Sequence, residues 1–556
     1  LTPLVVDQSH PFPFISNLSL NLAALITTSD LKKNQFVRVK IPTKNIGRFI
    51  QIPHEIKQSS NEKELSFITV EDLIGNNLNK LFAGMNCLSY SFFRVTRDAD
   101  LELKELEADD LLIAMEKSLQ RRRIGGEVVR LEVEEKMPKD ILKLLIEGIS
   151  ISKEYIYSSK SILALDDLNL LTKIDRKDLK KNLSIGQTNI ALRSLNDDSG
   201  KNIKSIFSIL RKQNILLHHP YDLFSDSIEE FINQAADDPL VMAIKITLYR
   251  VSKDSPIIKA LIRAAENGKE VMTLVELKAR FDEDNNIQWA KQLEQAGIHV
   301  VYGIIGFKTH TKISLVVRKE KKHLRNYFHI GTGNYNSNTS KFYTDIGLLS
   351  TDTEIASDLI ELFNYLSGFS QQKNYRKLLV APFSMREKFI FLIKREIENA
   401  KNGKKAQIIA KMNSLVDPEI ITLLYKASQT GVTIQLIVRG ICCLYPQRKN
   451  LSENIQVISI IGHFLEHSRI FWFFNNNNPE AYIGSADWMR RNLDRRIEAI
   501  VPIEDFEFKK RLYNLLTTYF KDNCFAWKMK QDGKYVKIID KVSNNSSQFD
   551  LIKNWH

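Results

Sequence analysis

Two stretches of this chain repeat the same order of predicted elements, and this internal duplication constrains the fold more than any other feature. In the first stretch we expect helices at 226–239, 255–267 and 282–296 and strands at 240–248, 270–277 and 298–305. In the second we expect helices at 384–400 and 416–429 and strands at 406–412 and 432–440. Strands that alternate with helices are typical of a parallel or mixed α/β sheet. The repeat therefore predicts two similar α/β domains in series.

The two copies also match at single residues. The strand region of the first copy ends in Arg280, and that of the second ends near Arg439. His310 follows Arg280 by 30 positions, and His467 follows Arg439 by 28. Residues i and i+2 of a strand project to the same face, so the imidazole of His310 and the ammonium of Lys312 should point into the same space.

A turn of small residues follows the next strand in each copy, GTGN at 331–334 and GSAD at 484–487. Backbone amides in such turns can donate to phosphate oxygens. We expect Asn334 and Asp487 to hold the opposite imidazole nitrogen or their own turn. Neutral imidazole is a good nucleophile toward phosphorus near pH 7, and a neighbouring cation neutralises phosphate oxygens. The duplicated pattern therefore favours phosphoryl transfer.

The composition agrees with a multidomain protein that meets polyanions. A chain of 556 residues is expected to form two to four domains. A net charge of +13 favours partners rich in phosphate. The four cysteines show no metal-ligand spacing and are typical of a reducing cytoplasm. No apolar run approaches the ~18–20 residues that a membrane span needs.

The residues before the duplication read differently. Alternating patterns predict strands at 35–42 and 127–135, and an apolar periodicity predicts a helix at 104–120. Polar, turn-rich stretches at 194–205 and 367–377 are the candidate domain boundaries. We therefore expect an α+β first domain at 1–196, followed by two α/β domains at 197–377 and 378–556.

The duplicated motifs resemble the phospholipase D superfamily, in which two HxK…GSxN halves meet at one pseudo-twofold site. Three departures stand out. Arg469 replaces the lysine of the second copy, Asp487 replaces the asparagine, and Val317 lies where the superfamily has an aspartate. The resemblance implies that the two α/β domains are phospholipase D-like and related by a pseudo-twofold axis.

Longer motifs point to a narrower match. The stretches LYRVSKDSPIIKALIRAAENGKEV, VELKARFDEDNNIQWAKQLEQAGIHV, HIGTGNYNSNTSKFYTDIGLL, LIVRGICCLYP and GSADWMRRNLDRRIE resemble the first family of polyphosphate kinases. FRVTRDADLEL and FISNLSLNLA resemble the second domain of the same family. The chain does not begin with Met, and we expect it to be a fragment that lacks the family's N-terminal helical domain.

The resemblance implies a role for individual residues. His310 would be the phosphorylated histidine, and His467 would be a second catalytic residue. ATP would be contacted by Tyr343, Arg439 and His467. For Tyr343, a place in the hydrophobic core is the alternative.

The resemblance also implies phosphate contacts. Arg250 and Arg280 would lie at the magnesium–triphosphate site. A guanidinium offers only donors, so we expect these two arginines to touch the phosphate ligands of Mg²⁺ rather than the metal. Lys312 and Asn334 would give supporting phosphate contacts. A polyphosphate channel would be lined by Arg490, Arg491, Arg495 and Arg496, for which a solvated charged face is the alternative.

The expected activity is reversible transfer of the ATP γ-phosphate to the end of a polyphosphate chain, with Mg²⁺ as cofactor and a phosphohistidine intermediate. Two rivals stay open: a phosphodiesterase of the phospholipase D type, and an inactive polyanion-binding fragment. The resemblance further implies a cytoplasmic homo-oligomer, a dimer or tetramer, with peripheral association at the inner face of the membrane as an open alternative. Nucleic acid is not an expected partner.

Overall fold

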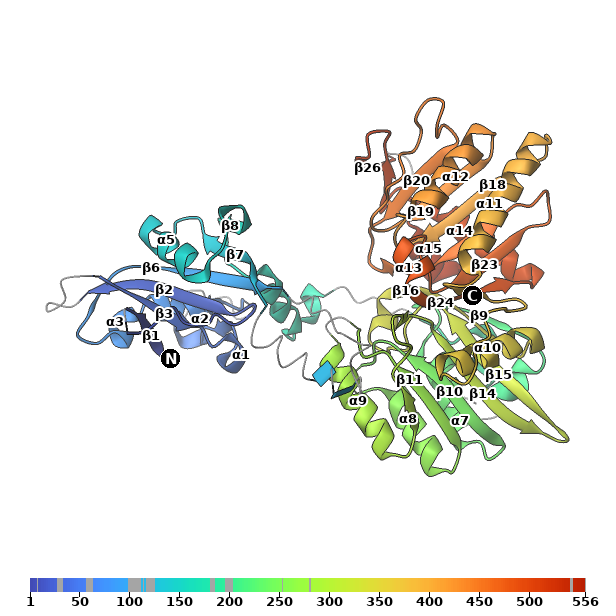
Figure 1. Cartoon of the computed structure of the whole chain (residues 1–556), viewed down its shortest axis with the longest axis horizontal. Coiled ribbons are helices and arrows are strands. Elements are labelled where there is room, and N and C mark those ends of the chain that lie inside the picture. The colour runs from blue at the N-terminus through green and yellow to red at the C-terminus, as the bar shows by residue number, and fades with distance from the viewer. Residues whose placement is uncertain are drawn as a thin grey trace. The chain divides into compact units, whose positions relative to one another are not determined.

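The structure is a computed structural model that divides into two compact units, unit 1 at Leu1–Asn182 and unit 2 at Leu183–His556 (Figure 1). The described residues are 1–7, 9–27, 34–56, 64–98, 112–113, 115–116, 126–180, 186–195, 204–252, 254–279, 282–540 and 544–555. Most of the helix expected at 104–120 lies outside them, and so does the boundary expected between 196 and 197.

Unit 1 is built on one six-stranded sheet with hydrophobic residues on both faces. The strand order is β1 (Pro3–Val6), β3 (Gln35–Lys40), β2 (Leu20–Thr27), β6 (Asn86–Arg97), β7 (Val128–Glu134) and β8 (Ile156–Ser159). Helix α5 (Lys139–Ile149) covers one face through Ile141 and Leu145. The other face is covered by α2 (Val70–Gly75) and α3 (Leu78–Leu81). Short elements complete the unit: α1 (Thr43–Ile46) and the paired strands β4 (Phe49–Gln51) and β5 (Phe67–Thr69).

The first half of unit 2 is a mixed sheet with helices on both faces. Its own strands are β9 (Ile215–His219), β10 (Val241–Leu248), β11 (Glu270–Val275), β12 (His299–Val301), β14 (Ile313–Glu320), β15 (His323–Gly331) and β16 (Tyr343–Ser350). Its helices are α6 (Ile206–Leu210), α7 (Glu230–Asp237), α8 (Pro256–Glu266), α9 (Glu283–Gln295) and α10 (Thr353–Leu366). A short π-helical turn, Ser225–Glu229, leads into α7.

The second half repeats this plan. Its own strands are β17 (Leu379–Ala381), β18 (Gln407–Met412), β19 (Thr433–Val438), β20 (Ile455–Ile460), β22 (Ile470–Phe473), β23 (Glu480–Gly484), β24 (Arg496–Ile503), β25 (Ala526–Met529) and β26 (Tyr535–Lys537). Its helices are α11 (Met385–Lys401), α12 (Pro418–Gln429), α13 (Arg490–Asp494), α14 (Phe506–Phe520) and α15 (Ser547–Asn554). The expected α/β architecture is confirmed.

Local sequence signals explain why the copies agree. Helices α8 and α12 both begin with a capping side chain followed by proline: Ser255 accepts from the Ile258 N–H, and Asp417 accepts from the Ile420 N–H. In the first half β10 pairs in parallel with β11 and antiparallel with β14, and in the second half β18 pairs in the same way with β19 and β22. One large hydrophobic cluster draws residues from both halves, including α10 and α14, so the halves share a core.

Two very short strands cross between the halves. Strand β13 (Lys308–Thr309) of the first half pairs with β24 of the second. In return, β21 (Leu465–Glu466) of the second half pairs with β16 of the first. Each of these strands is followed at once by a histidine of the duplicated motif. The exchange therefore brings each histidine to the sheet of the opposite half.

Some strands are shorter than the sequence predicts. The strand expected at 298–305 covers only His299–Val301, and two glycines with positive φ follow it, Gly303 at 89° and Gly306 at 83°. The strand expected at 270–277 ends at Val275. Arg280 therefore does not close that strand, and it lies outside the described residues.

Candidate active site

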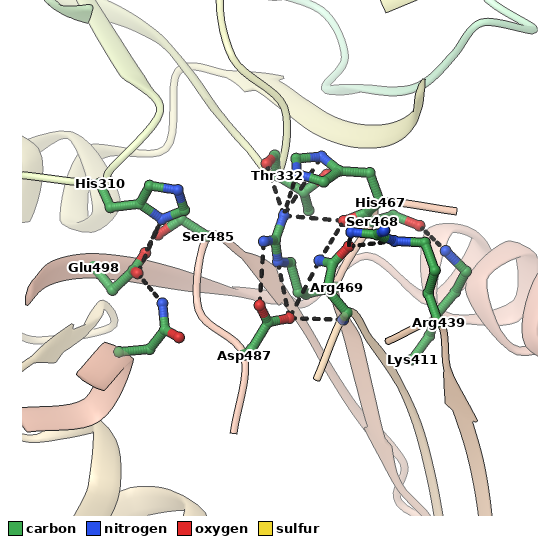
Figure 2. Close-up of polar contacts among 12 residues, drawn as sticks. His310, Thr332, Lys411, Arg439, His467, Ser468, Arg469, Ser485, Asp487 and Glu498 are labelled. Atoms are coloured by element: carbon green, nitrogen blue, oxygen red, sulfur yellow. Dashed lines mark hydrogen bonds and ion pairs between the residues drawn. The ribbon is translucent and has the colours of Figure 1, made fainter. Parts of the chain in front are cut away.

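His310 is fixed by backbone and side chain to the second half. Its N–H donates to the Ile497 carbonyl over 2.8 Å. Its ring Nδ1 lies 2.9 Å from both carboxylate oxygens of Glu498, which is fully buried. The ring meets Tyr249 edge-on, with the centroids 4.9 Å apart. Figure 2 shows the histidine and Glu498 pointing toward each other from opposite halves.

His467 forms the equivalent pair with a carboxylate of the first half. Its N–H donates to the Thr344 carbonyl over 3.2 Å, and its Nδ1 lies 2.8 Å from the Asp345 carboxylate. The hydroxyl of Thr332 donates to the same carboxylate oxygen over 2.6 Å. Each histidine is therefore oriented by a carboxylate from the other copy, an arrangement that fixes which ring nitrogen carries a proton.

Sequence reasoning missed both carboxylates. They lie at equivalent positions, because Asp345 follows Gly331 by 14 residues and Glu498 follows Gly484 by 14 residues. Both lie on the strand after the small-residue turn, in β16 and β24. That equal spacing was the signal that could have revealed them.

Of the two roles expected for Asn334 and Asp487, the contact with an imidazole nitrogen is not found in the described part of the chain, where Nδ1 of each histidine meets Glu498 or Asp345. Asp487 instead binds Arg469, with Nε–Oδ1 and Nη2–Oδ2 distances of 3.2 and 3.3 Å. It also accepts from the backbone N–H of Asn413 over 2.7 Å. The Oδ1 atom of Asn334 is buried and makes no hydrogen bond within the described residues. A negative charge at 487 is needed there because it neutralises a buried guanidinium.

Arg469 lies at the centre of the site, between the two histidine pairs (Figure 2). Its Nη1 is 3.1 Å from His467 Nε2 and 3.4 Å from the carbonyl oxygen of Thr332. The same Nη1 lies 3.5 Å from Nδ1 of His467, so the guanidinium packs against the imidazole ring rather than on one ring nitrogen. The described contacts of the His310 ring nitrogens go through Nδ1 alone, and 11% of this side chain is exposed.

The electrostatics of the first pair favour a neutral imidazole. Burial lowers the pKa of His310 well below its ordinary value, and the charges of Lys312, Arg496, Arg469 and His467 act in the same direction. Burial also raises the pKa of Glu498 to about 7, although Lys312 and Arg496 oppose this. The influence of Arg469 and His467 on His310 means that residues of both halves act on one site.

Lys312 is buried against the first histidine. Its Nζ donates to the His310 carbonyl over 2.6 Å and lies 5.0 Å from the centroid of the Tyr249 ring. Burial lowers the pKa of this ammonium to about 7, partly offset by Glu498. The lysine is therefore poised to change its charge when anions enter or leave.

Two of the three predicted ATP contacts surround His467. The ring of Tyr343 packs against the His467 ring with the centroids 5.1 Å apart. Arg439 follows β19, and its Nε and Nη2 donate to Asn413 Oδ1 over 2.9 and 2.7 Å. Asn413 in turn donates to the His467 carbonyl over 3.1 Å. Tyr343 and Arg439 are thus brought together with His467.

Among the other arginines predicted to bind phosphate, Arg250 and Arg496 lie near His310, whereas three are exposed. Arg250 pairs with Asp282 over 2.9 Å, and its guanidinium carbon lies 5.6 Å from the ring centroid of Tyr249, which contacts His310. Among the predicted channel residues, Arg496 begins β24 and acts on the charge of His310. The remaining three are exposed: Arg490, Arg491 and Arg495.

The donor set fits Mg²⁺ only if the ion arrives with phosphates. No group of three or more His, Cys, Asp or Glu side chains in the described part of the chain could hold a metal. Magnesium commonly binds through few protein carboxylates together with substrate phosphates.

None of the helices in the described ranges combines the length and the apolar composition that a membrane span requires.

Comparison with known proteins assigns the three parts of the chain to one family. Residues 1–171 match the polyphosphate kinase middle domain, residues 205–373 match the polyphosphate kinase C-terminal domain 1, and residues 378–548 match the polyphosphate kinase C-terminal domain 2. Together these models cover most of the chain.

Whole-chain relatives agree. The chain is 58% identical over 564 residues to a polyphosphate kinase of Parasynechococcus marenigrum, covering 100% of this chain and 79% of the relative. It is 50% identical over 547 residues to one of Synechocystis sp., covering 97% and 75%. The crystal structure of polyphosphate kinase from Porphyromonas gingivalis superposes with a TM-score of 0.84 at 30% identity, covering 100% of this chain and 80% of that chain. The chain therefore belongs to the polyphosphate kinase family.

Proposed function

We propose that this protein transfers the γ-phosphate of ATP reversibly to the end of a polyphosphate chain through a phosphohistidine on His310. The observation that carries the proposal is the contrast between the two imidazoles. Nδ1 of His310 is paired with Glu498, and burial keeps this ring neutral, so Nε2 has a lone pair for phosphorus. The ring of His467 instead has a cation packed against it, because Nη1 of Arg469 lies 3.1 Å from its Nε2 and 3.5 Å from its Nδ1.

The first step is nucleophilic displacement at the γ-phosphorus. A bond forms between His310 Nε2 and phosphorus, the bond from phosphorus to the β,γ-bridging oxygen breaks, and ADP leaves with that electron pair. The ring becomes a phosphorylated imidazolium that keeps its Nδ1 proton. The carboxylate of Glu498, 2.9 Å from Nδ1, stabilises the positive charge that develops on the ring.

The second step reverses the first with a different acceptor. A terminal oxygen of polyphosphate attacks the phosphorus, and Nε2 of His310 leaves with its electron pair. Both the phosphoramidate and the phosphoanhydride are energy-rich, so the cycle runs in either direction. The electron pair that returns to Nε2 restores the neutral ring with its proton on Nδ1, and burial keeps that ring neutral.

Cationic side chains lower the cost of bringing a triphosphate to this site. Lys312 of the first half and Arg439 of the second neutralise phosphate oxygens. Arg250 and Arg280 bind the phosphates that carry Mg²⁺. Asn334 supplies a further phosphate contact through its amide, and Arg496 extends the positive surface toward an incoming chain. Magnesium, when bound with ATP, neutralises phosphate charge.

His467 and Tyr343 serve the nucleotide. The Tyr343 ring packs on the imidazole of His467, and Asp345 fixes that imidazole through Nδ1. We place ATP beside them, with His467 exchanging the proton that the leaving nucleotide or the incoming chain requires. We further propose that the protein works in the cytoplasm, in keeping with its four unpaired cysteines, all of which are described. We also propose that it forms a homo-oligomer, a dimer or tetramer.

The test is turnover in both directions. Purified protein with Mg²⁺ is given ATP and polyphosphate, and separately ADP and polyphosphate, and ADP and ATP are measured. His310→Ala should abolish both reactions, while His323→Ala, at an exposed histidine in the β14–β15 hairpin, should leave both unchanged. Activity of His310→Ala above roughly a tenth of the parent contradicts the covalent role. Hydrolysis of a phosphodiester without nucleotide would support the phosphodiesterase instead.

A further inference from the structure

A short segment at 544–555 bridges the two halves of unit 2. Its helix α15 is anchored in the second half, where Asp522 accepts from the N–H and hydroxyl of Ser547 over 2.7 and 2.6 Å. At the other end, the indole N–H of Trp555 donates to Asp222 of the first half over 2.8 Å. The Trp555 ring also meets His218 of β9 edge-on at 4.6 Å. The segment is thus held by both halves.

Gln548 of this segment is bonded to the stretch Phe464–Glu466, which directly precedes His467. The side chain is fully buried. Its Oε1 accepts from the N–H of Phe464 over 3.0 Å, and its Nε2 donates to the Phe464 carbonyl over 3.0 Å and to Glu466 over 2.6 Å. Strand β21 has only two residues and pairs with β16, and the amide of Gln548 adds bonds to the residue before the strand and to the side chain of its last residue.

Glu466 extends the contact behind His467. Its second carboxylate oxygen accepts from the hydroxyl of Thr344 over 2.9 Å and lies 3.0 Å from Nζ of Lys411. Lys411 also donates to the hydroxyl of Ser468 over 2.7 Å. Glu466 and Ser468 flank His467 in an extended stretch, so their side chains face away from the imidazole. These contacts fix the residues on either side of His467, Glu466 and Ser468, on the side of the backbone opposite the imidazole.

The two copies hold the stretch before the histidine through different side chains. In the first half, the strand before His310 is held by Glu276, whose Oε2 accepts from the Thr309 N–H over 2.6 Å. Glu276 directly follows β11 and Arg439 directly follows β19, so in the structure Glu276, rather than the Arg280 matched from the sequence, occupies the position equivalent to Arg439. An arginine stands at this position in the second copy, and the stretch before His467 is instead bound by Gln548, at the backbone of Phe464 and the side chain of Glu466.

We infer that Gln548 is a positioning residue for His467, because it holds Phe464 and the side chain of Glu466 in the stretch that leads into this histidine. This role deepens the proposed function, since it rests on His467 serving the nucleotide. Removing the amide should loosen β21 and displace the imidazole from its place beside Tyr343. A misplacement of about 1 Å at a reacting group can cost on the order of 100-fold in rate.

The test compares two neighbours on one helix in the 556-residue chain. Gln548→Met keeps the length and volume of the side chain but loses its three hydrogen bonds. Ser547→Ala loses one hydroxyl bond to Asp522 and makes no contact with β21 in the structure as described. Two readouts are taken: hydrogen exchange of peptides that cover 462–468, and kcat/KM for ATP in polyphosphate synthesis.

We expect faster exchange at 462–468 and a roughly 10- to 100-fold lower kcat/KM for Gln548→Met, with Ser547→Ala close to the parent in both. If Gln548→Met does not fold, Gln548→Asn, which keeps the amide on a shorter stem, is read in the same assays. Parent-like exchange and rate in the glutamine variant, or equal losses in both variants, would overturn the inference. A parent protein that does not synthesise polyphosphate would contradict the proposed function instead.

Discussion

Replacing Glu498 by glutamine tests the role of the buried carboxylate behind His310. The substitution keeps the shape of the side chain and removes its charge. In the structure, Nδ1 of His310 lies 2.9 Å from both carboxylate oxygens, and Asn492 donates to one of them. The phosphorylated ring carries a positive charge that only an ionised partner can balance. Glu498→Gln should therefore slow the formation of phosphohistidine.

The size of the effect follows from the bond that is changed. A hydrogen bond to a charged group contributes about 1.5–3 kcal/mol, which corresponds to roughly a 10- to 150-fold change in rate. The assay is rapid mixing of protein with ATP and Mg²⁺, acid-free quenching, and measurement of phosphohistidine against time. Because burial raises the pKa of Glu498 to about 7, the parent should also slow as the pH falls below about 7, while the variant should lose that limb.

A matched control separates this role from the general cost of altering a buried acid. Glu396 of α11 is also fully buried, its pKa is also raised by burial, and it accepts from the backbone N–H groups of Gln407 and Asn475, away from the site. Glu396→Gln should phosphorylate at the parent rate. A parent rate for Glu498→Gln, or equal slowing in both variants, would refute the reasoning.

Three further substitutions probe the cations and the aromatic ring. Lys312→Arg should remove the loss of rate above pH about 7, because burial lowers the lysine pKa to about 7 whereas a guanidinium stays charged; an unchanged alkaline limb in a pH–rate series would contradict this. Tyr343→Ala should raise KM for ATP roughly 10-fold, by loss of ring packing, while Tyr343→Phe stays near the parent in steady-state kinetics. Arg496→Gln should weaken polyphosphate binding in a filter assay and Arg490→Gln should not. Of these two arginines, Arg496 is the one whose charge acts on the pKa of His310, and the side chain of Arg490 is 78% exposed. Equal effects of the two substitutions would argue against this assignment.

The repeated helix and strand order predicted the α/β fold because each long element has its own periodicity. Strand β18 and helix α12, for example, lie within a residue or two of the expected ranges. The exchanged strands β13 and β21 were not predicted. Each has only two residues, which leaves no periodicity to read, and each is fixed by a partner far away in the chain.

The candidate site was predictable where a motif repeats and not where a partner lies in the other copy. His310, His467 and the cation two residues after each were visible from the repeat alone. The pairing of His310 with Glu498 depends on contact between copies, which spacing within one copy does not reveal. Asp487 does not reach an imidazole nitrogen, the first of its two expected roles, because its carboxylate binds the buried Arg469. The arginine at position 469, where the motif has lysine, thus determines what the side chain at position 487 binds.

The most direct measurement is the mass of the intact protein after brief exposure to ATP and Mg²⁺, followed by localisation of any added group. The account predicts one added phosphoryl group per chain, stable to base, labile to acid, carried by the peptide that contains His310, and passed on to polyphosphate when the chain is supplied. A phosphoryl group found on His467 instead, or phosphate transfer to polyphosphate at full rate without any phosphorylated protein, would contradict it.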